Sequence, residues 1–180
     1  MAGIVATLLR KSAPEKDETE RPRNGLLSDY LIRQEGHDWP AIMSDWHWLV
    51  PPKFTIWIVN RYGDVFLTTG DNSVHMLELG AGTLKRVAAD REDFAKKVDE
   101  ENNANDWLLI PLVNKCVAAG LLLKPGQCYS YIKPPILGGT YTVENTEITD
   151  LAVHYSFLAQ IHRQIKDLPD GTKVKLVVRN

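Results

Sequence analysis

The sequence predicts an α+β fold, in which an antiparallel β-meander sheet is covered by three main helices. Four short strand-like runs follow one another between residues 54 and 88, and glycine, asparagine or aspartate stands at each gap. Three stretches with apolar residues at helical spacing follow this meander. Because a sheet with an apolar face needs a cover, we expect the helices to pack on it. Further strands are expected from the central loop region and the C-terminus.

One domain is expected over residues 26–180, because a chain of 180 residues can bury about 70% of its unfolded surface in a single core. Residues 1–25 are expected to be a flexible N-terminal segment, since Ser12 to Asn24 are almost wholly polar or charged and contain two prolines. The first residues do not read as an export signal, and no apolar run is long enough to span a membrane. We therefore expect a soluble, cytoplasmic protein.

The net charge and the cysteine content indicate which class of partner and which cellular compartment to expect. Twenty-one basic and 23 acidic side chains give a net charge of -2, which disfavours direct binding of nucleic acid. Cys116 and Cys128 have no metal-ligand spacing, and we interpret them as buried thiols of a reduced protein.

The N-terminal part of the domain, residues 26–53, combines a short helix with a tryptophan-rich segment. Leu26 to Arg33 has helical spacing and is followed by Gly36 as a stop. Trp39, Trp46 and Trp48 either form an aromatic cage for a ligand or cover an open end of the core. We favour the second interpretation.

The meander and the helices can be bounded from turn and cap residues. The predicted strands are Phe54 to Asn60, Asp64 to Thr69, Val74 to Leu79 and Thr83 to Ala88. The first helix begins at an Asp90 cap with Phe94 and Val98 on its inner side, and the second runs from Asp106 to Ala119, with Pro111 causing a kink or a late start. The third runs from Asp150 to Lys166, and a last strand is expected from Lys173 to Val178.

The stretch from Leu121 to Asn145 is the most distinctive part of the chain. A strand over Gln127 to Ile132 stops at Pro134-Pro135, and Gly138-Gly139 permits a reversal. Tyr141 and Val143 are expected to resume strand alternation toward Asn145. The product is a rigid, partly apolar loop on a sheet.

An acidic run covers the first predicted helix and the start of the second. Residues 90–106 hold seven acids against three bases. Such a run is most often a solvated face, but it is also the concentrated field best suited to a basic partner.

No recognisable catalytic or metal-binding motif is present. His154 and His162 are eight residues apart, which is too far for two ligands of one metal on a helix. Neither cysteine lies in a nucleophile motif, and there is no G-x-S-x-G sequence. We therefore expect no enzymatic activity, no cofactor and no metal.

A series of motifs carries a family resemblance: NRYGDVFL, PGQCYSY, PPILGG, EN, AQIHRQI and LPDGT. With these motifs the chain resembles the bacterial immunity proteins of type VI secretion DNase toxins, in the family whose C-terminal domain was formerly uncharacterised. The match extends from about Phe54 to Thr172. The resemblance implies an α/β immunity protein that binds a co-produced toxin in the cytoplasm and blocks it, without enzymatic activity of its own.

The expected partner is therefore a cognate effector toxin, which binds to a surface beside the PPILGG loop. The predicted partner-binding residues are Glu100, Glu101, Lys133 and Tyr141, with Gln127 and Tyr129 as supports of the loop. The alternative is a small-ligand or peptide-binding regulatory module, with the tryptophan-rich segment and the PPILGG loop as the walls of its pocket. A hydrolase is a third option, for which the sequence suggests no acid and base.

Overall fold

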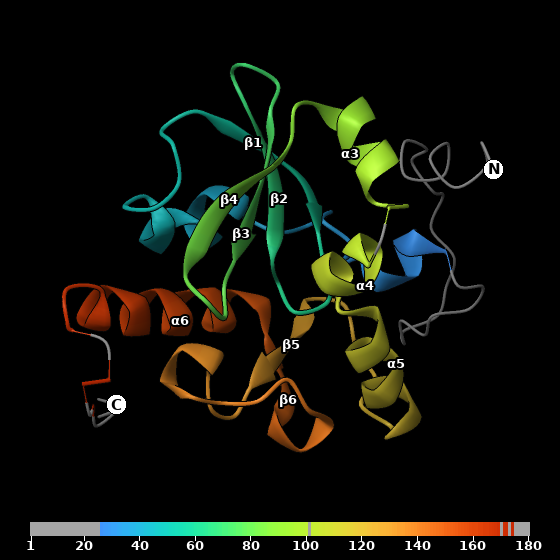
Figure 1. Ribbon diagram of the computed structural model, residues 1–180. Coiled ribbons are helices and arrows are strands. Elements are labelled where there is room, and N and C mark those ends of the chain that lie inside the picture. The colour runs from blue at the N-terminus through green and yellow to red at the C-terminus, as the bar shows by residue number, and fades with distance from the viewer. Residues whose placement is uncertain (1–25, 101, 170, 173, 175–180) are drawn as a thin grey trace.

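The computed structural model describes residues 26–100, 102–169, 171, 172 and 174 (Figure 1). Residues 1–25, Glu101 and most of the C-terminal strand expected from Lys173 to Val178 lie outside them. The described residues form a four-stranded antiparallel sheet, a two-stranded sheet and a set of helices. The predicted α+β fold class is confirmed.

The meander consists of β1 (Phe54–Val59), β2 (Val65–Thr69), β3 (Val74–Glu78) and β4 (Thr83–Ala88). Each strand pairs antiparallel with the next in the order β1-β2-β3-β4. The strands coincide with the predicted runs to within a residue or two. The turns between them are short, so each strand pairs with the next one along the chain.

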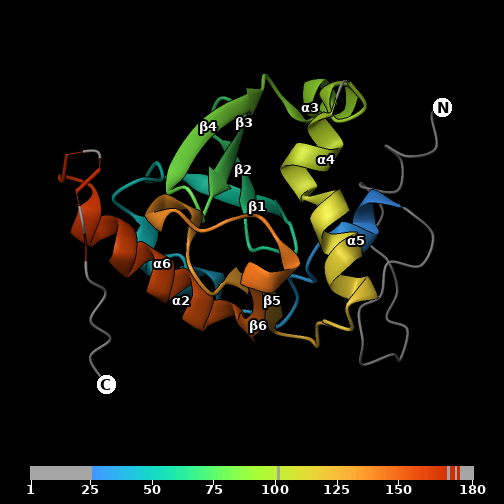
Figure 2. The same ribbon diagram turned by 60° about the horizontal axis from the view of Figure 1, so that its bottom comes forward.

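Both faces of the meander are apolar and buried, and each face is covered by a different set of helices. Ile58, Phe66 and Met76 pack toward α3 (Arg91–Lys97), α4 (Asn103–Leu108) and α5 (Ile110–Ala118). Val59, Leu67 and Leu77 face the opposite way, toward α6 (Leu151–Ile165) and the segment of α2 (Trp39–Ile42) and η2 (Ser44–Trp46). Figure 2 shows the sheet between α6 on one side and α3, α4 and α5 on the other.

The caps of two helices lie where the sequence predicts them. The Asp90 side chain accepts a hydrogen bond from the Asp93 N–H at 2.8 Å at the start of α3. The Asp150 side chain accepts from the Ala152 and Val153 N–H groups at the start of α6. These bonds satisfy amide groups that have no partner within the helix.

The helix expected from Asp106 to Ala119 is two helices in the structure. The break falls at Leu109, whose φ of 51° is left-handed, and α5 restarts with Pro111 in its first turn. Because proline lacks an N–H and crowds the preceding turn, the chain cannot continue one helix through this point. α4 also starts earlier than predicted, at Asn103.

The N-terminal helix is shorter than predicted. Only η1 (Leu27–Tyr30) is helical, after which Leu31 bridges Asn60 and the Ile32 N–H donates to the Val59 carbonyl at 2.8 Å. The end of β1 offers backbone partners that favour an extended chain here over another helical turn.

The two-stranded sheet pairs β5 (Gln127–Tyr131) with β6 (Thr146–Asp150). The expectation that Tyr141 and Val143 resume a strand is wrong. Residues Val143–Asn145 form a turn of 3-10 helix, η4, and the Thr142 carbonyl accepts bonds from the Asn145 N–H and the Thr146 hydroxyl. These local bonds delay the strand to Thr146. Among the described helices, none combines the length and apolar character that crossing a bilayer requires.

Candidate partner-binding site

The connection between β5 and β6, residues 132–145, is closed into a rigid loop by one side chain. The Asn145 Oδ1 accepts from the Lys133 N–H at 2.9 Å, and its Nδ2 donates to the Lys133 and Thr140 carbonyls at 2.9 and 2.8 Å. A Cβ on Gly139 would lie 1.7 Å from the Lys133 carbonyl oxygen, so only glycine fits this close approach. We call this segment the β5–β6 loop.

The β5–β6 loop rests on the turn between β3 and β4. A Cβ on Gly80 of that turn would lie 3.0 Å from the Tyr131 ring and 3.4 Å from Pro135. On the other side of the same turn, a Cβ on Gly82 would lie 2.3 Å from the His162 ring on α6. The β3–β4 turn therefore packs between the β5–β6 loop and α6, and these contacts fix the position of the loop relative to the four-stranded sheet.

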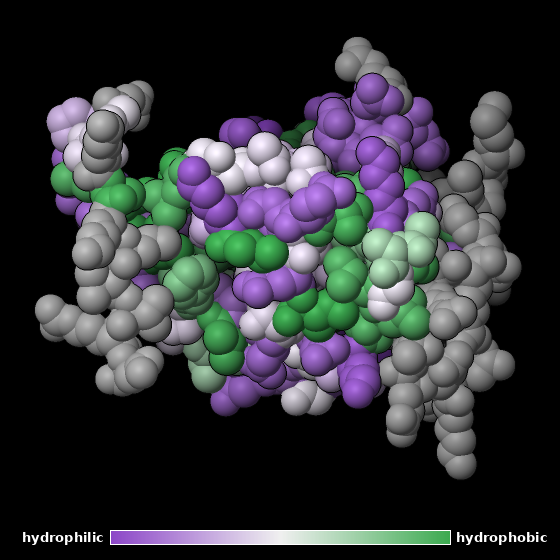
Figure 3. All heavy atoms as spheres, turned by 90° about the horizontal axis from the view of Figure 1, so that it is seen from below, coloured by the Kyte–Doolittle hydropathy of each residue, from purple (hydrophilic) through white to green (hydrophobic). Residues whose placement is uncertain are grey.

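The β5–β6 loop presents apolar side chains to solvent. Ile132 is 61% exposed, Ile136 is 44% exposed and Tyr141 is 45% exposed. Figure 3, which views the molecule from the side of α6, β5 and β6, shows hydrophobic side chains gathered among polar ones over the middle of this face. Apolar side chains exposed together on an ordered loop are typical of a protein-binding surface.

Tyr141 is held in place although it is half exposed. Its hydroxyl donates to the Glu78 Oε1 at 3.1 Å, and its ring packs edge-on against Tyr131, with 5.4 Å between the ring centroids. Tyr131 in turn stacks on Tyr62 in the core. Burial and the neighbouring Glu78 carboxylate raise the pKa of Tyr141, so the phenol stays protonated and can donate its hydrogen bond to Glu78.

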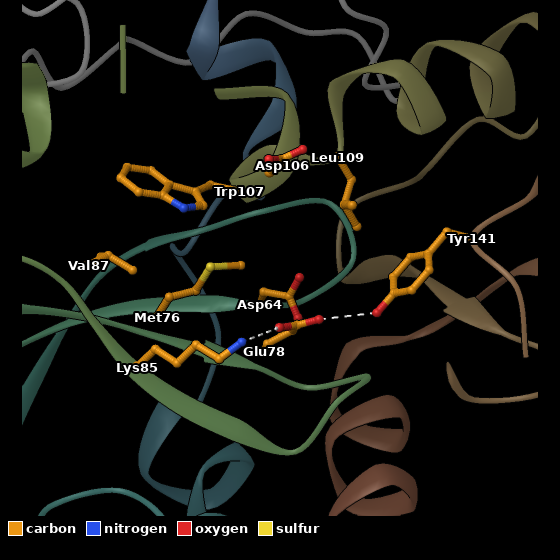
Figure 4. A pocket seen from close by; sticks show the side chains of 9 residues that line it. All are labelled: Asp64, Met76, Glu78, Lys85, Val87, Asp106, Trp107, Leu109 and Tyr141. Atoms are coloured by element: carbon orange, nitrogen blue, oxygen red, sulfur yellow. Dashed lines mark hydrogen bonds and ion pairs between the residues drawn. The ribbon is translucent and has the colours of Figure 1, made fainter. Parts of the chain in front are cut away.

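Tyr141 also forms one side of a hollow of about 360 Å³ (Figure 4). The other walls come from β3, β4 and the end of α4, at the break before α5. The residues that line it are Asp64, Met76, Glu78, Lys85, Val87, Asp106, Trp107, Leu109 and Tyr141. The hollow thus joins the last acid of the acidic run to the β5–β6 loop.

The Asn60 side chain organises the base of the hollow. Its Nδ2 donates to the Asp64 Oδ2 and to the Trp107 carbonyl, each at 2.9 Å, and its Oδ1 accepts from the Tyr62 and Asp64 N–H groups. All four hydrogen-bonding positions of this buried amide are filled. The turn after β1 and the end of α4 are therefore locked together.

The base of the hollow holds a buried carboxyl group, that of Asp64. Asp64 is only 4% exposed, and burial raises its pKa to about 7, although bonds from Asn60 and the Leu79 N–H oppose the rise. The nearby Glu78 carboxylate adds to it. The cation at the hollow is Lys85, whose Nζ lies 3.8 Å from the Glu78 Oε2 and whose side chain is 67% exposed.

The described residues among those predicted to bind a partner lie in three parts of the chain: the β5–β6 loop, the connection between α3 and α4, and β5. Lys133 and Tyr141 are exposed on the β5–β6 loop, and Glu100 is exposed between α3 and α4. Glu101 lies outside the described residues. Gln127 is half-buried and accepts a bond from the Lys124 N–H.

Tyr129 is fully buried, and its hydroxyl donates to the Leu121 carbonyl at 2.7 Å. It packs against Tyr62 in the core, with 5.3 Å between the ring centroids. A partner cannot touch it, so its place fits a support of β5 and not a contact.

The sequence does not mark four charged or aromatic residues of the hollow as site residues: Asp64, Glu78, Lys85 and Trp107. Asp64 lies in the NRYGDVFL motif, whose closely spaced polar residues between two strands were a usable signal. Trp107 reaches the hollow through tertiary packing between segments far apart in the chain, and a local sequence pattern cannot predict such packing.

The tryptophan-rich segment covers the core, as the favoured interpretation expected. Trp46 is fully buried and its Nε1 donates to the Tyr155 carbonyl at 3.1 Å. Trp39 packs edge-on against the Tyr155 ring, and Trp48 stacks on Trp46. With Trp46 fully buried, the three rings do not form the open cage of the alternative.

The two histidines of α6 are structural. The His154 Nδ1 is 3.0 Å from the Ser130 hydroxyl and its Nε2 is 3.0 Å from the Tyr62 carbonyl, while the His162 Nε2 is 2.8 Å from the Leu79 carbonyl. Burial lowers the pKa of both rings, that of His154 to about 4. In the part of the chain that the structure describes, no three His, Cys, Asp or Glu side chains are grouped to hold a metal ion.

The comparison with protein families bears on the segment that builds this site. Residues 88–162 match the family model of the T6SS immunity protein Tdi1, C-terminal. The match runs from the end of β4 through α3, α4, α5, the β5–β6 loop and β6 into α6, and it covers less than half of the chain. It supports the resemblance to type VI secretion immunity proteins and an immunity role. No protein with a curated description matches the chain.

Proposed function

We propose that this chain is an immunity protein that binds and neutralises a toxin encoded beside it, a nuclease delivered by type VI secretion, by occluding it. It acts in the cytoplasm, where nucleic acid is the toxin's target, and it acts by binding and not by catalysis. The observation that carries the proposal is the family match over residues 88–162, which contains the whole β5–β6 loop.

The β5–β6 loop suits a binding role because it is ordered before the partner arrives. The Asn145 bonds and the close approach at Gly139 fix its backbone. Binding through a preorganised loop avoids much of the entropy cost of ordering a flexible one. Tyrosine is also enriched among the residues that dominate protein interfaces, and Tyr141 is anchored by Glu78 with its remaining surface exposed.

The acidic run supplies the complementary charge. Asp99 and Glu100 are exposed between α3 and α4, and Asp106 is exposed at the rim of the hollow. Enzymes that act on nucleic acid carry cationic surfaces, because their substrate is a polyanion. Opposite charges speed the association of two proteins and align them, most strongly at low salt.

Co-expression tests this function directly. A toxin domain encoded next to this chain is expressed in a bacterial host with and without the immunity chain, and growth and chromosomal DNA integrity are followed. We expect growth arrest and DNA loss with the toxin alone, and rescue with both chains, which also co-purify. Toxicity that persists despite equal expression of both chains would rule the proposal out.

A further inference from the structure

We propose that the hollow between β3, β4, α4 and the β5–β6 loop receives an arginine side chain of the toxin, an inference that rests on the immunity function proposed above. The hollow is therefore a specificity pocket within a larger interface. Its size, its charge and its aromatic walls each point to this occupant.

The size of the hollow fits one long side chain. Its volume of about 360 Å³ is at the lower end of the range of pockets that hold small ligands, roughly 300–1,000 Å³. Met76, Val87 and Leu109 supply apolar surface against which the methylene groups of a long side chain can pack. Figure 4 shows these side chains around a central space with carboxyl groups at its base.

The charge of the lining favours a cation over an anion. Asp64, Glu78 and Asp106 bring three carboxyl groups, against the single ammonium group of Lys85. Lys85 compensates weakly, since it is two-thirds exposed and 3.8 Å from Glu78. The Tyr141 phenol keeps its proton and donates to Glu78, so it brings no charge. An anionic ligand would meet a net negative wall.

The aromatic walls favour a guanidinium over an ammonium group. Trp107 and Tyr141 stand on opposite sides of the hollow (Figure 4). Phe94 stacks on Trp107 with 5.0 Å between the ring centroids and 24° between the planes, which holds the indole in place. A planar guanidinium stacks on aromatic faces and offers five donors to several carboxylates, whereas the more strongly hydrated ammonium of lysine does neither as well.

Asp64 makes cation binding in the hollow depend on pH near neutrality, which binding to exposed carboxylates would not do. With a pKa near 7, its carboxyl group is partly protonated at neutral pH. An arriving cation stabilises the charged form and displaces the proton. The charged and titratable groups around Asp64 are Glu78, Lys85, Asp106 and Tyr141 in the hollow, and Cys128, Tyr131 and Tyr155 in the core behind it. Cation binding is therefore expected to strengthen between pH 6 and pH 8.

The first test uses the co-encoded toxin. Glu78→Gln and Asp106→Asn each remove a charge from the hollow, and the glutamine keeps an oxygen to accept the Tyr141 hydroxyl. Each variant should weaken toxin binding by about tenfold or more, while Asp167→Asn, on an exposed residue after α6, should bind as the unsubstituted chain does. If the unsubstituted chain binds and neither variant is weaker, the arginine pocket is wrong and the immunity function stands.

The second test needs no toxin. The tripeptide N-acetyl-Gly-Arg-Gly-amide is titrated at pH 6 and pH 8, with the Trp107 indole N–H followed by NMR, beside the same peptide with neutral citrulline. We expect saturable binding of roughly millimolar affinity for the arginine peptide, tighter at pH 8 and lost in Glu78→Gln. An unmoved Trp107 signal, or equal binding of the citrulline peptide, would overturn the pocket. If the unsubstituted chain fails to bind the toxin, the immunity function falls, and this titration decides the cation site by itself.

Discussion

Replacing Asn145 with alanine should loosen the β5–β6 loop without unfolding the domain. The substitution removes three hydrogen bonds, two to Lys133 and one to Thr140. Each such bond contributes about 0.5–1.5 kcal/mol net, and the freed backbone groups are exposed enough to reach water. We therefore expect a cost of about 2 kcal/mol, confined largely to the loop.

Native-state amide exchange measures this local cost. About 2 kcal/mol corresponds to an exchange rate that rises roughly 30-fold at protected amides of the loop. The reporters are the Gly138 and Gly139 N–H groups, which donate to the Pro135 and Pro134 carbonyls. Amides in β2 and β3 of the meander serve as internal controls and should be unchanged. Toxin affinity should fall as well, because the partner must then order the loop.

A second substitution separates hydrogen bonding from size. Asn145→Asp keeps the oxygen that accepts from the Lys133 N–H, but it replaces the amino group with an oxygen that faces two carbonyls. It should loosen the loop at least as much as alanine. If Gly138 and Gly139 exchange at the unsubstituted rate in both variants, the loop is held by something other than Asn145, and the reasoning about preorganisation fails.

Three further outcomes can be checked. The pKa of His154 falls from 6.5 unfolded to about 4 folded, so the unfolded state binds more protons below pH 6.5. His154→Gln should consequently gain about 3 kcal/mol of unfolding free energy relative to the unsubstituted chain between pH 7 and pH 4, measured by urea titration; a constant difference would contradict it. Gly82→Ala should lower the melting temperature, by roughly 4 °C or more, because its φ of 64° and the His162 ring 2.3 Å from the new Cβ both oppose a side chain; Gly70→Ala, in open space, is the control. Reversing Glu100 and Glu101 to lysine should weaken toxin binding and flatten its salt dependence in a surface-binding assay, and an unchanged salt response would dismiss the acidic run as a contact.

The meander and the helix starts could be predicted because their causes are local. Turn residues stand between the strands, and Asp90 and Asp150 cap helices through bonds to amides two or three residues away. Pro111 also predicts a kink or a late start, although the sequence does not predict that the break falls at Leu109. Chemistry that spans a few residues can be read from the order of those residues.

The hollow could not be predicted because its causes are distant in the chain. Asp64 follows β1, Glu78 ends β3, Trp107 belongs to α4 and Tyr141 to the β5–β6 loop. Their meeting depends on Asn60, which bonds both Asp64 and Trp107. The strand predicted at Tyr141 and Val143 fails for a local reason: the Thr142 carbonyl accepts bonds from the Asn145 N–H and the Thr146 hydroxyl, and these close a turn that a short alternating run does not outweigh.

The hydrogen bonds of the Asn145 side chain that close the β5–β6 loop all end on main-chain atoms. Asn145 bonds the backbone of Lys133 and Thr140, and Gly139 lies against a carbonyl, while the outward side chains of Ile132 and Ile136 take no part in closing it. Side chains at those two positions can therefore be exchanged without redirecting the path of the chain. Under the proposed immunity function, substitutions at these two positions would change which toxin surface the loop recognises, while the hydrogen bonds beneath it stay the same.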